Sequence, residues 1–340
     1  MSDRKISERE RSERPWSLAT LGLHALLLCL LLMRAELFSD VLAAHPLYPH
    51  SSQTSFQDPL PRSRTPAATA IELESASHAL SQGDLNRSEL ILRRVLAREP
   101  KNWRAHHLLG LVFFQRGEPD AAESELRTAD AASPGSASFF YDFGVVLLSR
   151  NKFEEAARQL EKSVRLNPND ALVLVFLGRA YHELNYSQKA NQLFRKALEL
   201  DPSVHEGNYH LGFSYQSLGD IAQAEKYFRK ELQLDPHHAL SWYAIGEIEY
   251  ERGNDDAAME AVDRAIQNTG VRAKALYLRG KILRRRGRND EARQCFLKAT
   301  EIRPDMVDAY FQLAALARQT GDTAAAEHYL KLYNEIKQRK

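Results

Sequence analysis

The chain has 340 residues, with 46 lysines and arginines against 45 aspartates and glutamates, and only two cysteines. This near-balanced charge argues against a bulk attraction to nucleic acid or anionic membranes, so any charged site must be local. Cys29 lies in an apolar run near the N-terminus and Cys295 stands alone in the rest of the chain, so no disulfide within one domain is expected.

The first predicted element is an apolar helix over residues 17–33, which reads SLATLGLHALLLCLLLM and contains no charge. At about 1.5 Å per residue it is roughly 25 Å long, the short end of what crosses a bilayer core of about 30 Å. Residues 1–16 before it are rich in cations, whereas Glu36 and Asp40 follow it. The positive-inside rule therefore predicts a single-pass membrane protein with a cytoplasmic N-terminus and a periplasmic or otherwise extracytoplasmic main part.

A cleaved signal peptide is the alternative, and it would leave a secreted or periplasmic soluble protein. Its best cleavage candidates, Ala43 and Ala44, lie about ten residues beyond the apolar core. We therefore favour an uncleaved anchor. Residues 34–68 are rich in Pro and Ser without helical periodicity, which is typical of a flexible tether.

From residue 69 to the C-terminus the sequence resembles itself every 34 residues, without insertion. The eight units begin at residues 69, 103, 137, 171, 205, 239, 273 and 307. Positions within a unit are counted from these starts. Small residues recur at positions 8, 20 and 27, where side chains of this size let two helices pack closely. Large apolar residues recur at position 24 and should fill the space that the small residues leave.

Two further positions predict where helices end. Position 15 is Gly in six units, as expected for a left-handed cap after the first helix of the pair. Position 32 is Pro in six units, which ends the second helix. The fifth unit shows the whole pattern in Leu211, Gly212, Tyr215, Gly219, Asp220, Ala224, Phe228 and Pro236.

This pattern of W/L-x-x-L-G-x-x-Y, then A-x-x-x-F, A and P resembles the tetratricopeptide-repeat (TPR) family over residues 69–340. The resemblance implies an all-α fold, a right-handed superhelical solenoid of eight TPR helix pairs, here preceded by one N-terminal transmembrane or signal helix. Both terminal units depart from the pattern, as end caps of a solenoid do. In the last unit Tyr333 replaces the small residue of position 27 and is expected to lie over the open end.

In the TPR family, first-helix residues at positions 2, 5, 9, 12 and 13 line a concave groove that holds a peptide or a helix. Here these positions are rich in aromatic residues, and we take as groove candidates Tyr141, Tyr209, Phe213, Tyr243, Tyr250, Tyr277 and Phe311. Tyrosine is a good anchor because it offers a large apolar area and a polar tip. Two interpretations stay open, since the rings either form a peptide-binding ladder or only cover neighbouring helices.

The seventh unit contains the basic stretch RGKILRRRGRNDEAR. Arg284, Arg286 and Arg288 are candidates for docking an anionic partner. The sixth unit is acidic at corresponding positions, so adjacent helices could instead pair these charges and leave only a surplus of arginines for a partner.

No catalytic or metal-binding motif is found, so we expect a protein that is not an enzyme and that needs no cofactor or metal. The expected partners are other proteins or peptides, and the membrane through residues 17–33, with no nucleic acid and no small-molecule substrate. The sequence therefore predicts a membrane-anchored interaction scaffold. A soluble adaptor after signal cleavage, and a regulatory subunit of a separately encoded enzyme, are the alternatives.

Overall fold

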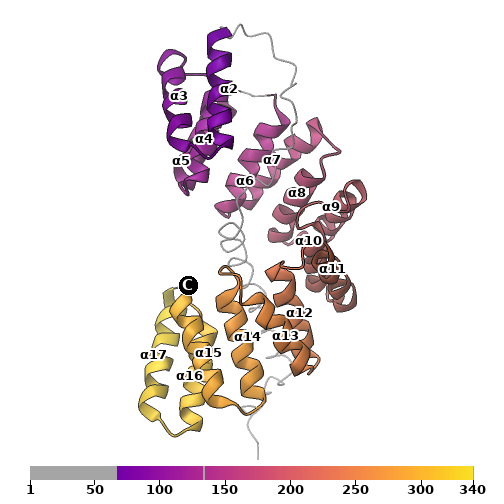
Figure 1. Ribbon diagram of the computed structural model, residues 1–340, viewed down its shortest axis with the longest axis vertical. Coiled ribbons are helices and arrows are strands. Elements are labelled where there is room, and N and C mark those ends of the chain that lie inside the picture. The colour runs from indigo at the N-terminus through magenta and orange to yellow at the C-terminus, as the bar shows by residue number, and fades with distance from the viewer. Residues whose placement is uncertain (1–66, 133–134, 340) are drawn as a thin grey trace, which may run out of the picture.

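A computed structural model describes residues 67–132 and 135–339, and it contains sixteen α-helices and no strand within them (Figure 1). They form eight antiparallel pairs, each made of a helix A and a helix B. The A helices are α2 (Ala67–Ser81), α4 (Trp103–Gln115), α6 (Ala137–Ser149), α8 (Ala171–Glu183), α10 (Gly207–Ser217), α12 (Ala239–Glu251), α14 (Arg272–Arg285) and α16 (Val307–Gln319). The B helices are α3 (Leu85–Arg98), α5 (Pro119–Ala131), α7 (Phe153–Leu166), α9 (Ser187–Leu200), α11 (Ile221–Leu234), α13 (Asp255–Ala265), α15 (Asn289–Ile302) and α17 (Thr323–Arg339).

The turn from helix A to helix B requires a left-handed residue at position 15. The six glycines there have φ values between +75° and +85°. In the third and fourth repeats Asn151 and Asn185 occupy the same position with φ of 56° and 65°. Asparagine tolerates this conformation better than most residues, so all eight repeats turn in the same way.

Each helix pair is held together by a small residue of helix A against a large residue of helix B. A Cβ added to Gly280 would lie 2.5 Å from the Phe296 ring, and one added to Gly144 would lie 2.5 Å from Leu160. Phe296 and Leu160 are fully buried. Positions 8 and 24 of one repeat therefore face each other, which confirms the packing predicted from the alternation of small and large residues.

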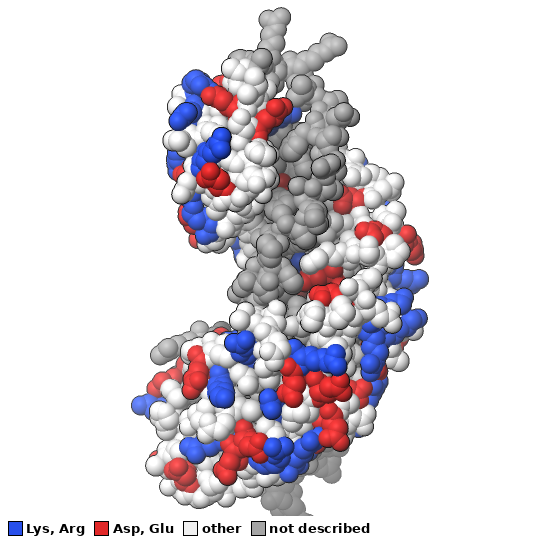
Figure 2. All heavy atoms as spheres, viewed as in Figure 1, with Lys and Arg blue, Asp and Glu red and all other residues white. Residues whose placement is uncertain are grey.

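The pairs stack along an arc whose two ends lie on the same side (Figure 1). The A helices of successive repeats contact each other directly, as α6 does with α8 and α8 with α10. The closely packed A helices therefore form the inner face of the arc, and the B helices lie further out. Figure 2 shows the arc hollowed on its left-hand side.

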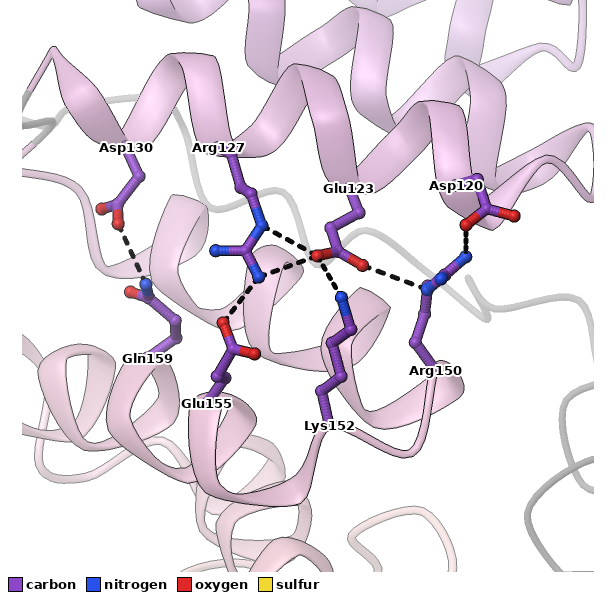
Figure 3. Close-up of polar contacts among 8 residues, drawn as sticks. All are labelled: Asp120, Glu123, Arg127, Asp130, Arg150, Lys152, Glu155 and Gln159. Atoms are coloured by element: carbon purple, nitrogen blue, oxygen red, sulfur yellow. Dashed lines mark hydrogen bonds and ion pairs between the residues drawn. The ribbon is translucent and has the colours of Figure 1, made fainter.

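Ion pairs join neighbouring repeats on top of the apolar packing. Glu123 of α5 accepts hydrogen bonds from Arg127 of its own helix and from Lys152 of the next repeat, 2.6 Å away (Figure 3). Arg150 of the next repeat also lies 3.0 Å from the Glu123 carboxylate. The hydrogen bonds of Lys152 and Arg127 outweigh burial, so the pKa of Glu123 is lowered. This carboxylate thus stays charged and links the second repeat to the third.

The Glu123–Arg150 contact belongs to a repeated pattern that joins position 21 of one repeat to position 14 of the next. Glu89 and Arg116 make the same contact at 2.7 Å, and Glu225 and Arg252 make it at 2.6 Å. Between the fourth and fifth repeats these positions are Asn191 and Leu218. The pattern therefore reinforces some junctions of the solenoid and not others.

The predicted transmembrane or signal helix and most of the predicted tether lie outside the described residues. Within the part of the chain that the structure describes, no helix is long and apolar enough to cross a membrane. At the other end, Tyr333 packs against Phe311 of the last helix A, with ring centroids 5.8 Å apart.

Candidate binding site on the inner face

The aromatic residues predicted from the repeat lie on the A helices at different depths. Tyr209 and Tyr243 are buried, whereas Phe311 is 51% exposed. The remaining candidates are partly buried; they are Tyr141, Phe213, Tyr250 and Tyr277. The buried rings pack against neighbouring helices, as the second interpretation expects. The partly exposed rings can also contact a ligand.

Tyr209 lies at the centre of this surface. Its ring centroid is 5.8 Å from that of Phe228 on helix B of its own repeat and 5.1 Å from that of His238, the N-cap of α12 in the next repeat. It also stacks on Phe213, one turn further along α10, with centroids 6.2 Å apart. Tyr209 therefore joins the fifth repeat to the sixth, and its removal would disturb the wall of the inner face.

A buried polar cluster surrounds this tyrosine. The Glu206 carboxylate lies 3.3 Å from Nε2 of His210 and 3.6 Å from Nε2 of His238. Glu206 has φ of 55°, and α10 begins only after it, at Gly207. Nδ1 of His238 accepts a hydrogen bond from the backbone N–H of Ser241, which caps the start of α12. Glu206 thus connects the N-terminal ends of α10 and α12.

Burial and charge shift the pKa values of the two histidines in opposite directions. Burial lowers the pKa of His210 to about 4, even though Glu206 acts in the other direction. Burial also opposes the charge of His238, but Glu206 outweighs it and raises the pKa of His238. Burial opposes the charge of Glu206 too, yet the two histidines hold its pKa well below the ordinary value. The cluster therefore holds a charged Glu206 beside a neutral His210, and Glu206 makes His238 the easier of the two histidines to protonate.

The inner face of the sixth and seventh repeats combines tyrosines with charges. The hydroxyl of Tyr243 donates a hydrogen bond to Glu247 at 2.8 Å. The Tyr250 ring lies under two cations of the next repeat, 4.3 Å from Nζ of Lys281 and 3.9 Å from the guanidinium carbon of Arg285. Burial raises the pKa of Glu247. These contacts order the aromatic rings and leave a mixed apolar and charged surface.

The basic stretch of the seventh repeat is largely paired with the sixth. Arg286 lies 2.6 Å from Asp256 and 3.5 Å from Asp255, and Arg288 pairs with Glu291 of its own repeat at 2.6 Å. Arg284 donates a hydrogen bond to Gln312 of the last repeat. The three predicted docking arginines are thus not brought together around one site. Their role in binding a partner stays a prediction.

Sequence reasoning missed the Glu206 cluster and the ion pairs between positions 21 and 14, although it raised charge pairing between the sixth and seventh repeats as one alternative. The ion pairs have a readable signal, because a Glu and an Arg recur 27 residues apart at three junctions. The Glu206 cluster has a weaker signal in the sequence. In the fifth repeat Glu231 stands at position 27, where most repeats place a small residue. Glu231 accepts a hydrogen bond from the backbone N–H of Tyr209, and burial raises its pKa.

The described residues contain no group of three or more His, Cys, Asp or Glu side chains arranged to hold a metal ion.

Comparison with protein families agrees with this architecture. Models of the tetratricopeptide repeat match residues 73–137, 141–205, 209–273 and 307–339, and a model of the TPR repeat matches residues 280–321. The chain belongs to the tetratricopeptide-repeat family. No curated protein matches this TPR protein.

Two solved structures resemble its fold. A tetratricopeptide repeat protein from Parabacteroides merdae has a TM-score of 0.60 at 18% identity, covering 73% of this chain and 98% of that one. The APC/C hetero-tetramer Cut9–Hcn1 has a TM-score of 0.60 at 16% identity, covering 79% of this chain and 53% of that one. This TPR protein thus spans about half the length of the latter chain. At such identities the likeness concerns the fold alone.

Proposed function

We propose that this TPR protein is a membrane-anchored scaffold whose inner face holds a peptide or helix of a partner protein. The observation that carries the proposal is the row formed by position 9 of three consecutive A helices, where the partly exposed Phe213, Glu247 and Lys281 follow one another. An apolar ring beside charges of both signs suits a partner segment with a matching order of charged and apolar residues. Binding such a segment requires no catalytic group.

The membrane part of the proposal rests on the apolar run at residues 17–33 and the cations before it. Anchoring would hold the solenoid close to a bilayer, which raises the effective concentration of partners in the same membrane. N-terminal sequencing of the mature protein separates this proposal from the secreted adaptor. A mature chain that starts near Ala44 would rule out the anchor.

The binding role can be tested by photo-crosslinking in cells that express the full-length chain. A photoreactive residue at Phe311 on the inner face should capture a partner, whereas one at the exposed Ser124 on α5, a B helix, should not capture the same partner. The combination of Phe213→Glu with Lys281→Glu should abolish that capture, because it removes an apolar contact and reverses a charge. An unchanged set of captured proteins, with folding verified by circular dichroism, would contradict the proposal.

Tyr277→Ala is a useful companion variant, whereas Tyr209→Ala and Tyr243→Ala are not. The latter two truncate buried rings and are expected to cost about 3–5 kcal/mol of stability, by analogy with other buried aromatic residues. A loss of binding in those variants would not separate recognition from folding. Tyr277 is only partly buried, so its truncation reports more directly on the surface.

A further inference from the structure

The outer side of the fourth and fifth repeats carries cations that have no carboxylate partner. Arg195 and Lys196 on α9, and Lys226 and Lys230 on α11, are all exposed. Among the ion pairs of the described residues none involves these four side chains, whereas Arg229 on α11 pairs with Glu225 at 2.8 Å. We call these four cations the outer basic surface. Figure 2 shows lysines and arginines gathered along the right-hand edge, at the place of α11 in Figure 1.

The contrast with the seventh repeat is informative. The arginines of that repeat are more numerous in sequence, but Arg285 and Arg286 pair with Asp255 and Asp256 of the repeat before. In the fourth repeat, which precedes α10, the two positions equivalent to Asp255 and Asp256 are not carboxylates. The density of basic residues in the sequence therefore does not by itself locate the cations that are available to a partner, and four of these lie together on α9 and α11.

Exposed leucines accompany the outer basic surface at a fixed spacing. Leu200 follows Lys196 by four residues and is 42% exposed, and Leu234 follows Lys230 by four residues and is 51% exposed. Residues four apart lie on the same face of a helix. The third repeat has the same lysine and leucine, Lys162 and Leu166, but there Lys162 lies 3.4 Å from Asp130, so among the described helices only α9 and α11 combine the exposed leucine with an unpaired lysine. The sixth repeat breaks this pattern, because its equivalent of the leucine is Asn268.

An aromatic ring holds two of the cations in place. The ammonium groups of Lys226 and Lys230 lie 5.8 Å and 4.9 Å from the centroid of the Tyr227 ring, which itself stacks on Tyr215 at 5.6 Å. A cation that rests on an ordered ring loses less side-chain freedom when it binds an anion. The surface is therefore better prepared for an acidic ligand than lysines at random surface positions.

We infer that the outer basic surface, together with Leu200 and Leu234, docks an acidic amphipathic helix of a partner protein. The leucines would contact the apolar face of that helix, and the four cations would pair with carboxylates along its edges. The charge favours an acidic partner, and the exposed leucines favour a ligand with an apolar face rather than a purely ionic one. This site lies on the B helices, so it is separate from the inner face and would allow the solenoid to hold two partners at once.

The inference can be tested with the full-length chain and synthetic peptides. The probe is a fluorescent helical peptide about five turns long, with leucines on one face and glutamates at its edges. A counterpart carries lysines in place of the glutamates. Fluorescence anisotropy should show binding of the acidic peptide only, and combining Lys196→Glu with Lys230→Glu should weaken it by about tenfold or more.

Matched variants make the result specific. Lys298→Glu changes the same position in the seventh repeat and should leave the dissociation constant of the acidic peptide unchanged. Combining Leu200→Gln with Leu234→Gln should weaken binding even though no charge is altered. Phe213→Glu on the inner face should have no effect on the acidic peptide, which separates this surface from the proposed groove.

Three outcomes would overturn the inference. The first is equal binding of the acidic and basic peptides, and the second is binding of the acidic peptide that survives both charge reversals. The third is a surface that fails to bind the acidic peptide but binds vesicles containing phosphatidylglycerol in a manner dependent on Lys196 and Lys230. That result would assign the surface to an anionic membrane instead.

Discussion

Replacement of His210 by Phe should change how the stability of the protein depends on pH. His210 is buried beside Phe194, with the two rings stacked at 5.6 Å, and burial lowers its pKa from 6.5 to about 4. Below pH 6.5 the unfolded chain therefore takes up a proton that the folded protein does not, so folding loses stability as the pH falls towards 4. At about 1.4 kcal/mol per pH unit, the loss reaches about 3 kcal/mol at pH 4.

His210→Phe keeps an aromatic ring on Phe194 but cannot be protonated, so this loss should disappear. His238 and Glu206 also titrate, with opposite effects. The raised pKa of His238 contributes stability below pH 6.5 that is lost as the pH rises through its folded value. The lowered pKa of Glu206 contributes stability above pH 4.5 that is lost as the pH falls. The difference between variant and wild type removes the titration of His210 and reduces the stabilisation that comes from the lowered pKa of Glu206.

Urea unfolding followed by circular dichroism at several pH values between 7 and 4 would measure this difference. The stability of His210→Phe relative to wild type should rise by up to about 3 kcal/mol across that interval. The rise falls short of that value near pH 4, because the variant also lacks one of the two histidines that lower the pKa of Glu206. Parallel curves for the two proteins would refute the assignment of His210 as a neutral buried histidine.

Three further predictions concern the solenoid itself. Gly280→Ala should destabilise the protein by about 1–2 kcal/mol, because its Cβ would lie 2.5 Å from the Phe296 ring, and this overpacking exceeds the gain in helix propensity. Gly246→Ala should cost less stability, because a Cβ on Gly246 would lie 3.0 Å from its nearest atom. Equal melting temperatures for Gly280→Ala and Gly246→Ala would contradict this packing. Glu123→Gln should cost about 1–3 kcal/mol at pH 7, and the cost measured by urea unfolding should vanish as the pH falls through the lowered pKa of Glu123. Asn151→Ala should cost about 1 kcal/mol in the same assay, because φ is 56° there, whereas Asn151→Gly should be close to neutral.

The helical repeat could be predicted from the sequence because it rests on residue size and backbone conformation. A glycine inside a helix, repeated every 34 residues, has to face a large side chain, and the structure places Phe296 against Gly280 as that logic requires. The turns were predicted where glycine marks them. At Asn151 and Asn185 the same left-handed conformation occurs without glycine, so those two turns are not marked by residue type as clearly.

The buried cluster could not be predicted in the same way. Glu206 occupies a position that is variable among the repeats, and its carboxylate meets His238 only because two repeats stack in space. The late start of α10 also follows from the left-handed conformation of Glu206, which local sequence does not demand. A repeat pattern describes what the units share, whereas this cluster depends on what distinguishes the fifth unit from the others.

The same limit explains why the basic stretch of the seventh repeat was a poor guide to the surface charge. Arg286 finds its carboxylates in the sixth repeat, roughly one unit earlier in the chain, so its charge is compensated by residues that a short sequence window does not include. Lys230 lies in a less basic stretch, yet it has no such partner. In a solenoid each unit contacts only its neighbours, so the electrostatic character of a repeat is decided by adjacent pairs of units. A search for docking surfaces on this protein should therefore count charges after pairing each repeat with the one before it, and the four cations of α9 and α11 are among those that stay unpaired.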